Sequence, residues 1–210
     1  MKKKLSTGIL AGLLLVGMLG SAWATPTTLI SAGSDWNYTT SSTDLWTNWS
    51  AITFNTFNWD TAQWSTGTAA FGNANTYRGV TVNPYHTNWT AGTDLALQKD
   101  IVIDGNLLGP LSLKVAVDNG FILFVNGAQV AKQNAELFTS NWEYNLDIAS
   151  SYFTQGTNRI SVLAEDHGGL TYFDMQLTAD VQPVPEPATM LLFGTGLVGL
   201  VGAGLRRKKS

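Results

Sequence analysis

Hydrophobic and polar residues alternate with a period of two over much of the chain between Leu95 and Val181. Such alternation predicts β-strands with one face buried and the other in water, as in antiparallel sheets. The clearest segments span 95–103, 111–118, 160–165 and 172–181. We therefore expect a core that includes the inward-facing residues Leu113, Val115, Val117, Phe173, Met175 and Leu177.

A β-hairpin is predicted where the continuous apolar run Phe121–Val125 is followed by Asn126-Gly127. This dipeptide is the strongest short-range hairpin signal, because both residues tolerate a positive φ. Residues 25–89 are rich in Thr, Ser, Asn and Trp and show no sustained helical period. Many short strands joined by Gly and Asn turns predict an all-β fold with little helix, an antiparallel β-sandwich.

The N-terminus has the pattern of a secretory signal peptide. A basic Lys2-Lys3-Lys4 stretch precedes an apolar run at 9–19 that is too short to span a bilayer, and Ala22 and Ala24 occupy the small-residue positions of a cleavage site. We predict a signal peptide at 1–24 and a mature protein that begins at Thr25. The alternative is an uncleaved N-terminal anchor.

The C-terminus carries three signals in a fixed order. Pro185-Glu186-Pro187 is followed by 18 uncharged residues at 188–205 and by a basic tail at 206–210 that begins with Arg206 and Arg207. Eighteen apolar residues are about the minimum for a transmembrane helix, and the cations would keep the tail cytoplasmic. We therefore divide the chain into signal peptide (1–24), ectodomain (25–182) and C-terminal region (183–210).

This C-terminal arrangement resembles the PEP-CTERM sorting signal of Gram-negative bacteria. The resemblance implies that an exosortase in the inner membrane recognises the tail and cleaves near Pro-Glu-Pro. It also implies that the protein is anchored in the inner membrane only transiently, through its C-terminal helix, before it reaches the cell surface or an exopolysaccharide matrix. The alternative is a permanent tail anchor.

The net charge of the predicted ectodomain differs markedly from that of the whole chain. The region 25–182 keeps five basic and 14 acidic residues, a net charge of −9, whereas the whole chain has −3. Such a surface repels phosphate backbones, so nucleic acid is not expected as a partner. The chain also has no cysteine, which excludes disulfides, thiol catalysis and thiolate metal sites.

The segment 111–130, LSLKVAVDNGFILFVNGAQV, is similar to the strand–turn–strand–turn–strand portion of galactose-binding-like jelly rolls. Trp64 and Phe71-Gly72 upstream and 156–160 downstream fit the same pattern. The resemblance implies a jelly-roll ectodomain. Domains of that kind serve as carbohydrate-binding modules, as accessory domains of glycosidases and as adhesion or scaffold modules, so the fold alone does not identify the function.

Tryptophan is frequent, with seven residues in the predicted mature chain, four of which follow asparagine (Trp49, Trp59, Trp89 and Trp142). An indole face can stack on a sugar ring while a neighbouring amide bonds its hydroxyls. We select Trp46, Trp49 and Trp89 as candidate glycan-binding residues, because their polar surroundings suggest exposure. We expect Trp59 and Trp64 in the core or its lid.

Two polar segments contain side chains that could form a chemical site. Asp118-Asn119-Gly120 is predicted to form a turn with a positive φ at Gly120, and a structural calcium bound by its oxygens is the alternative. Residues 165–169, Glu-Asp-His-Gly-Gly, are predicted to be a hairpin loop rather than an active site. We therefore expect no catalytic residues, metal or other cofactor.

These observations favour a non-enzymatic, exported surface or matrix module that binds extracellular polysaccharide. The first alternative is a structural or adhesive exoprotein without a specific small ligand. A hydrolase of matrix glycans is less favoured, because scarce His and Glu offer few catalytic pairs.

Overall fold

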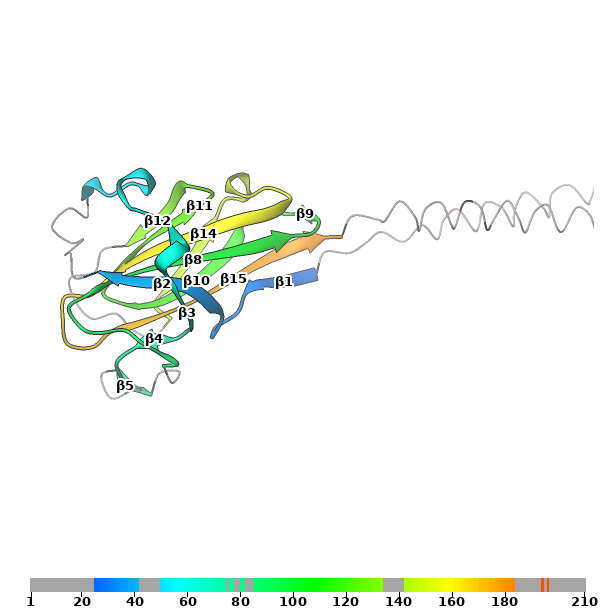
Figure 1. The fold of residues 1–210 in the computed structure, drawn as a ribbon. Helices are drawn as coiled ribbons and strands as arrows, with labels where there is room; N and C mark the ends of the chain where they lie inside the picture. Colours follow the sequence, from blue (N-terminus) through cyan, green and yellow to red (C-terminus); the bar gives the residue numbers. More distant parts are fainter. Residues whose placement is uncertain are drawn as a thin grey trace, which may run out of the picture. The chain divides into compact units, whose positions relative to one another are not determined.

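The computed structural model describes residues 25–41, 50–74, 76–77, 80–81, 85–133 and 142–183, together with Gly194 and Gly196. Thr25–Val181 forms one compact unit. Helical structure in the described part of that unit is limited to short 3-10 turns, and the rest is mainly strand (Figure 1).

The strands and 3-10 turns have the following bounds: β1 Thr25–Ile30, β2 Asp35–Ser41, η2 Phe54–Thr56, η3 Thr61–Gln63, β3 Ser65–Thr68, β4 Phe71–Gly72, β5 Thr76–Tyr77, β6 Val80–Thr81, β7 Thr87–Asn88, β8 Asp94–Ile103, β9 Asn106–Leu107, β10 Leu111–Asp118, β11 Gly120–Val125, β12 Ala128–Gln133, β13 Tyr144–Ile148, η4 Ser150–Tyr152, β14 Gly156–Glu165 and β15 Tyr172–Gln182.

Two sheets form the sandwich. Sheet A has the order β13-β10-β15-β4-β7, and β1 and β9 also pair with β15. Sheet B has the order β12-β11-β14-β8-β2-β3. Every pair with a defined register is antiparallel except β4–β7, which is parallel. The predicted antiparallel β-sandwich is therefore confirmed.

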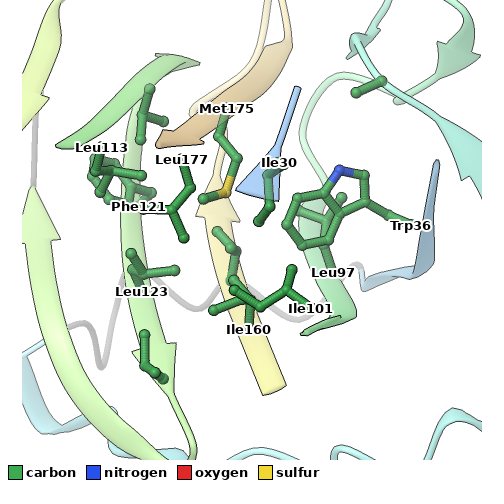
Figure 2. Close-up of a cluster of buried hydrophobic side chains, with 14 of the residues drawn as sticks. Ile30, Trp36, Leu97, Ile101, Leu113, Phe121, Leu123, Ile160, Met175 and Leu177 are labelled. Atoms are coloured by element: carbon green, nitrogen blue, oxygen red, sulfur yellow. The ribbon is translucent and has the colours of Figure 1, made fainter. Parts of the chain in front are cut away.

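The main core lies between the two sheets (Figure 2). In sheet A the register places Leu113 opposite Leu177 and Val115 opposite Met175, so the apolar positions of β10 and β15 share the inner face. Side chains of β8, β11 and β14 meet them from sheet B, among them Leu97, Leu123 and Ile160. All six predicted core residues are buried.

The predicted hairpin at Asn126-Gly127 is confirmed. It joins β11 to β12, and the φ angles of Asn126 and Gly127 are 51° and 84°. The Asn126 side chain also ties the turn to the neighbouring loop, because its amide donates to the Tyr152 carbonyl (3.1 Å) and to Asn158 Oδ1 (2.9 Å). The turn is thus held both by its backbone conformation and by a side chain.

Two connections differ from expectation because they cross between sheets. β10 lies in sheet A and β11 in sheet B, with Asn119 alone between them, and Gly120 does not take the predicted positive φ. Residues 166–171 join β14 of sheet B to β15 of sheet A, so the predicted hairpin there is also wrong. The expected turn glycines are confirmed, since Gly168 and Gly169 have φ of 97° and 96°. Alternation identified the strands, but it carries no information on which sheet each strand joins.

Candidate functional site

The outer face of sheet B is covered by apolar side chains. Ile122, Phe124 and Leu163 point away from the main core and form a second buried cluster with Ile52 and Ala96. Four half-buried aromatic residues pack on this cluster, and we call them the aromatic lid: Phe54, Phe57, Trp59 and Trp64. The prediction that Trp59 and Trp64 lie in the core or its lid is confirmed.

The aromatic residues of the lid pack mainly against one another and against the sheet. The Trp59 ring stacks on Phe54 with a centroid separation of 5.3 Å and an interplanar angle of 10°, and it contacts Phe124 at 5.9 Å. Its indole N–H donates to the Phe54 carbonyl at 2.8 Å. A sugar would need a free indole face, and Phe54 covers one face of the Trp59 ring. The Trp64 ring contacts Phe57 and Trp59.

The outer face of sheet A differs in chemistry. Side chains that alternate with the core residues of β10, β13 and β15 point outward here, and the register arranges them in two rows across the strands. We call this set the open face, and it consists of Asp147, Ser112 and Thr178 in one row and Asn145, Lys114 and Gln176 in the next.

The side chains of the open face are exposed or half-buried. In the part of the chain that the structure describes, none of the six forms a side-chain hydrogen bond or an ion pair with another residue. The face therefore offers hydroxyl, amide, ammonium and carboxylate groups whose hydrogen bonds go to water or to a ligand. Its two charged groups, Lys114 and Asp147, are of opposite sign, so the face is neutral overall.

An aromatic cluster borders the open face further along β10 and β15. Ala70, Ala116 and Tyr172 are buried there, and Trp142 and Leu170 pack against them. Trp142 is half-buried and has a left-handed backbone (φ 56°). That conformation costs an aromatic residue about 1–3 kcal/mol, so it persists only where the surroundings hold it. In the sequence, Trp142 follows asparagine as three other tryptophans do, and no signal there singles it out.

A buried carboxylate lies between the open face and this aromatic border. Asp174, opposite Ala116 in the register, is 1% exposed. Burial raises the pKa of Asp174 to about 6, against the lowering effect of hydrogen bonds from the Gly33 and Met175 amides. The Gly33 N–H lies 3.3 Å and 3.2 Å from the two carboxylate oxygens. Asp174 thereby ties the turn after β1 to the outer side of β15.

The two crossovers are bonded to each other at one end of the sandwich. The Asn119 N–H donates to the Glu165 carbonyl at 2.7 Å, and the His167 N–H donates to Asn119 Oδ1 at 2.9 Å. Asp166 Oδ2 accepts from the Gly92 and Gly168 amides. The pKa of Asp166 lies above its ordinary value because burial raises it by more than the hydrogen bonds from Gly92 and Gly168 lower it. These hydrogen bonds join the loop at 166–171 to Asn119 and to the loop that contains Gly92.

No group of three or more His, Asp or Glu side chains within the described ranges has an arrangement that could hold a metal ion. Asp118 is buried, opposite Tyr172 at the end of β10. The structure thus adds nothing in favour of the calcium alternative at 118–120.

Trp89 requires a correction. The sequence suggested an exposed side chain in a polar loop, but Trp89 is 0% exposed and belongs to the main core. Its indole N–H donates to the Thr93 carbonyl at 2.7 Å, and its own carbonyl accepts from the Thr171 hydroxyl at 2.6 Å. The polar neighbours that suggested exposure instead satisfy the polar atoms of a buried ring. The other two candidates, Trp46 and Trp49, lie outside the described residues.

The predicted processing sites also lie largely outside the described residues. This holds for Ala22 and Ala24 and for the sorting residues Pro185, Glu186, Pro187, Arg206 and Arg207. Thr25, the predicted first mature residue, begins β1. Among the residues that are described, no helix is long and apolar enough to cross a membrane. The predicted transmembrane segment 188–205 falls almost wholly in the undescribed part.

Comparison with known proteins identifies the C-terminal region. Residues 183–208 match the PEP-CTERM protein-sorting motif, which confirms the resemblance seen in the sequence. This motif implies exosortase processing and export to the cell surface by way of the membrane. A search of curated proteins finds no match to this sequence.

Several solved structures are similar to the sandwich. A β-glucuronidase from Ruminococcus gnavus is 7% identical with a TM-score of 0.47, and the match covers 77% of this chain and 30% of that one. A β-glucuronidase from an uncultured Clostridium sp. is 9% identical with a TM-score of 0.45, covering 78% and 30%. An α-L-rhamnosidase from Streptomyces avermitilis, complexed with L-rhamnose, is 16% identical with a TM-score of 0.33, covering 44% and 11%. The match thus spans less than a third of each enzyme, and likeness at this level says nothing about ligands or activity.

Proposed function

Because residues 183–208 carry a PEP-CTERM protein-sorting motif, we propose that this chain is an exosortase-sorted surface or matrix protein whose β-sandwich binds extracellular polysaccharide through the open face of sheet A. The observation that supports binding is the contrast between the two outer faces. Sheet B is covered by the aromatic lid, whereas sheet A presents, beside an aromatic cluster, six polar side chains that form no hydrogen bond or ion pair with the residues that the structure describes.

The open face suits an uncharged polysaccharide. Hydroxyl and amide groups can both donate to and accept from sugar hydroxyls, and rows that run across three strands match a linear polymer better than a compact ligand. Trp142, at the aromatic border, would supply a ring for stacking. A polyanionic polymer is disfavoured, because the region 25–182 has a net charge of −9.

We further propose that the protein binds the polysaccharide without cleaving it. The carboxylate pair Glu165 and Asp166 is buried, and Asp166 accepts from the Gly92 amide of a neighbouring loop and from the Gly168 amide of its own loop. A glycosidase needs two carboxylates that reach opposite sides of one sugar bond. The hydrogen bonds of Asp166 support a role in fixing the loop at 166–171 against the loop that contains Gly92.

Binding is tested with the exported protein on a panel of neutral, acidic and amino-sugar polysaccharides. Gln176→Ala and Lys114→Ala should each weaken binding of a neutral polymer about two- to tenfold, as expected for one hydrogen bond. Trp142→Ala should weaken it more. Thr66→Ala, an exposed position on β3 of the other sheet, is the matched control. Trp49→Ala tests the remaining sequence candidate in the same assay.

The outcomes separate the alternatives. Weakened binding in the open-face variants, with normal thermal unfolding, supports the proposal. Binding that depends on Trp49 alone would move the site elsewhere. No binding to any polymer would favour the second candidate, a structural or adhesive exoprotein. One observation already favours that candidate: of the five described tryptophans, two are fully buried and three are half-buried.

A further inference from the structure

The strand at the predicted mature N-terminus pairs with the strand that precedes the sorting motif in the sequence. β1 begins at Thr25 and runs antiparallel to the end of β15, with Thr25 opposite Val181 and Pro26 opposite Asp180. The match to the sorting motif begins at residue 183, directly after β15 ends at Gln182. Only Pro183 and Val184 therefore separate the last strand from Pro185.

Proteases bind their substrates as extended, unpaired chain, and folded segments are cut through transiently opened states. Two spacer residues extend at most about 7 Å, since an extended chain rises roughly 3.3–3.6 Å per residue. An enzyme that cuts near Pro185 and holds several residues before the cut would reach Val181 and Asp180. In the folded sandwich these residues are paired with Thr25 and Pro26.

The first residues of β1 have features that favour separation from β15. Pro26 and Thr28 are exposed, and the register shifts between Thr28 and Ile30. Proline cannot donate to a sheet ladder, and a register shift interrupts one. Ile30, by contrast, is 1% exposed and belongs to the main core. The anchored part of β1 is thus its end at Ile30, and the exposed Pro26 and Thr28 can separate from β15 at little cost in buried surface.

We propose that residues 25–28 of β1 control access of the exosortase to the sorting signal, so that cleavage requires these residues to unpair from the end of β15. In the cleavage step one peptide bond near the motif breaks. Its acyl group, on the ectodomain side, passes to the oxygen of water or of an acceptor hydroxyl, and its amino group takes up a proton and leaves with the tail. The rate of this step then depends on the fraction of molecules in which β1 is open.

A reversible staple tests the proposal in a host that contains the exosortase. The chain has no cysteine, so the double variant Thr25→Cys/Val181→Cys can form a single disulfide between registered partners. Removal of the tail from the oxidised full-length chain should slow at least tenfold, and a reductant should restore it. The matched control is Asn37→Cys/Thr66→Cys, a registered pair of exposed residues between β2 and β3. Its oxidation should leave the processing rate unchanged.

An inserted linker distinguishes loss of exosortase access from general damage to the fold. Eight Gly and Ser residues inserted between Gln182 and Pro183 should restore processing of the stapled chain, because the enzyme then no longer needs the end of β15. The same linker without the staple should speed processing of the native chain. Equal rates with and without the staple would overturn the proposal, and so would a linker that changes neither rate. Replacement of Pro185-Glu186-Pro187 by three alanines should abolish processing in every background, and tail removal in that variant would refute the sorting assignment instead.

Discussion

Replacing Trp89 by Ala should destabilise the sandwich strongly, although the sequence around it suggested an exposed ring. The indole is fully buried in the main core, and its N–H is bonded to the Thr93 carbonyl at 2.7 Å. Truncating a buried aromatic side chain costs about 3–5 kcal/mol, and the unpaired carbonyl adds about 1 kcal/mol. Together these terms give about 4–6 kcal/mol, and for a domain of this size each kcal/mol lowers the melting temperature by about 2–4 °C, so a fall of roughly 8–24 °C is expected.

Urea and thermal unfolding of the region 25–182, followed by circular dichroism and tryptophan fluorescence, would measure this loss. Trp89→Phe keeps most of the apolar volume and removes the donor, so it should cost only about 1–3 kcal/mol. Trp64→Ala is the matched control, because this half-buried lid residue buries less surface. The packing argument would fail if Trp89→Ala unfolded at the same urea concentration as the parent protein, or if Trp64→Ala cost as much.

Three further predictions follow from the core, from a buried carboxylate and from the N-terminus. Leu177→Ala, at a position 1% exposed, should cost about 2–5 kcal/mol in urea unfolding, and a cost below 1 kcal/mol would contradict the assigned core. Burial raises the pKa of Asp174 from 3.8 to about 6. The folded state therefore binds the proton more tightly than the unfolded state, and stability should fall as pH rises from about 4 to 6. Asp174→Asn should flatten that part of the pH profile, and an unchanged profile would show that another group titrates. Mass spectrometry of the exported protein should find Thr25 at its N-terminus, and a chain that retains residues 9–19 would show that the signal peptide is not removed there.

Much of the strand pattern was available from the sequence. The alternation in β10 and β15 reports which side chains face the core, because successive residues of a strand point to opposite sides. Asn126-Gly127 identified its hairpin because few residues accept two consecutive positive φ angles. The sorting motif could also be recognised from the sequence, since its three signals follow one another directly in the chain. These are local properties, and the local sequence determines them.

Sheet membership and exposure were decided only by the tertiary structure. The connection through 166–171 has the turn glycines of a hairpin, yet it joins strands of different sheets. β14 pairs with β8 in sheet B and β15 pairs with β10 in sheet A, and the local sequence of the connection does not specify these partners. Trp89 lies among Asn and Thr residues, yet the carbonyl of Thr93 and the hydroxyl of Thr171 satisfy its polar atoms and allow the ring to be buried. The open face likewise exists only because the register aligns polar residues from β10, β13 and β15. The sequence shows that each of these strands has a polar side, but pairing over long separations determines whether those sides form one surface and whether anything covers it.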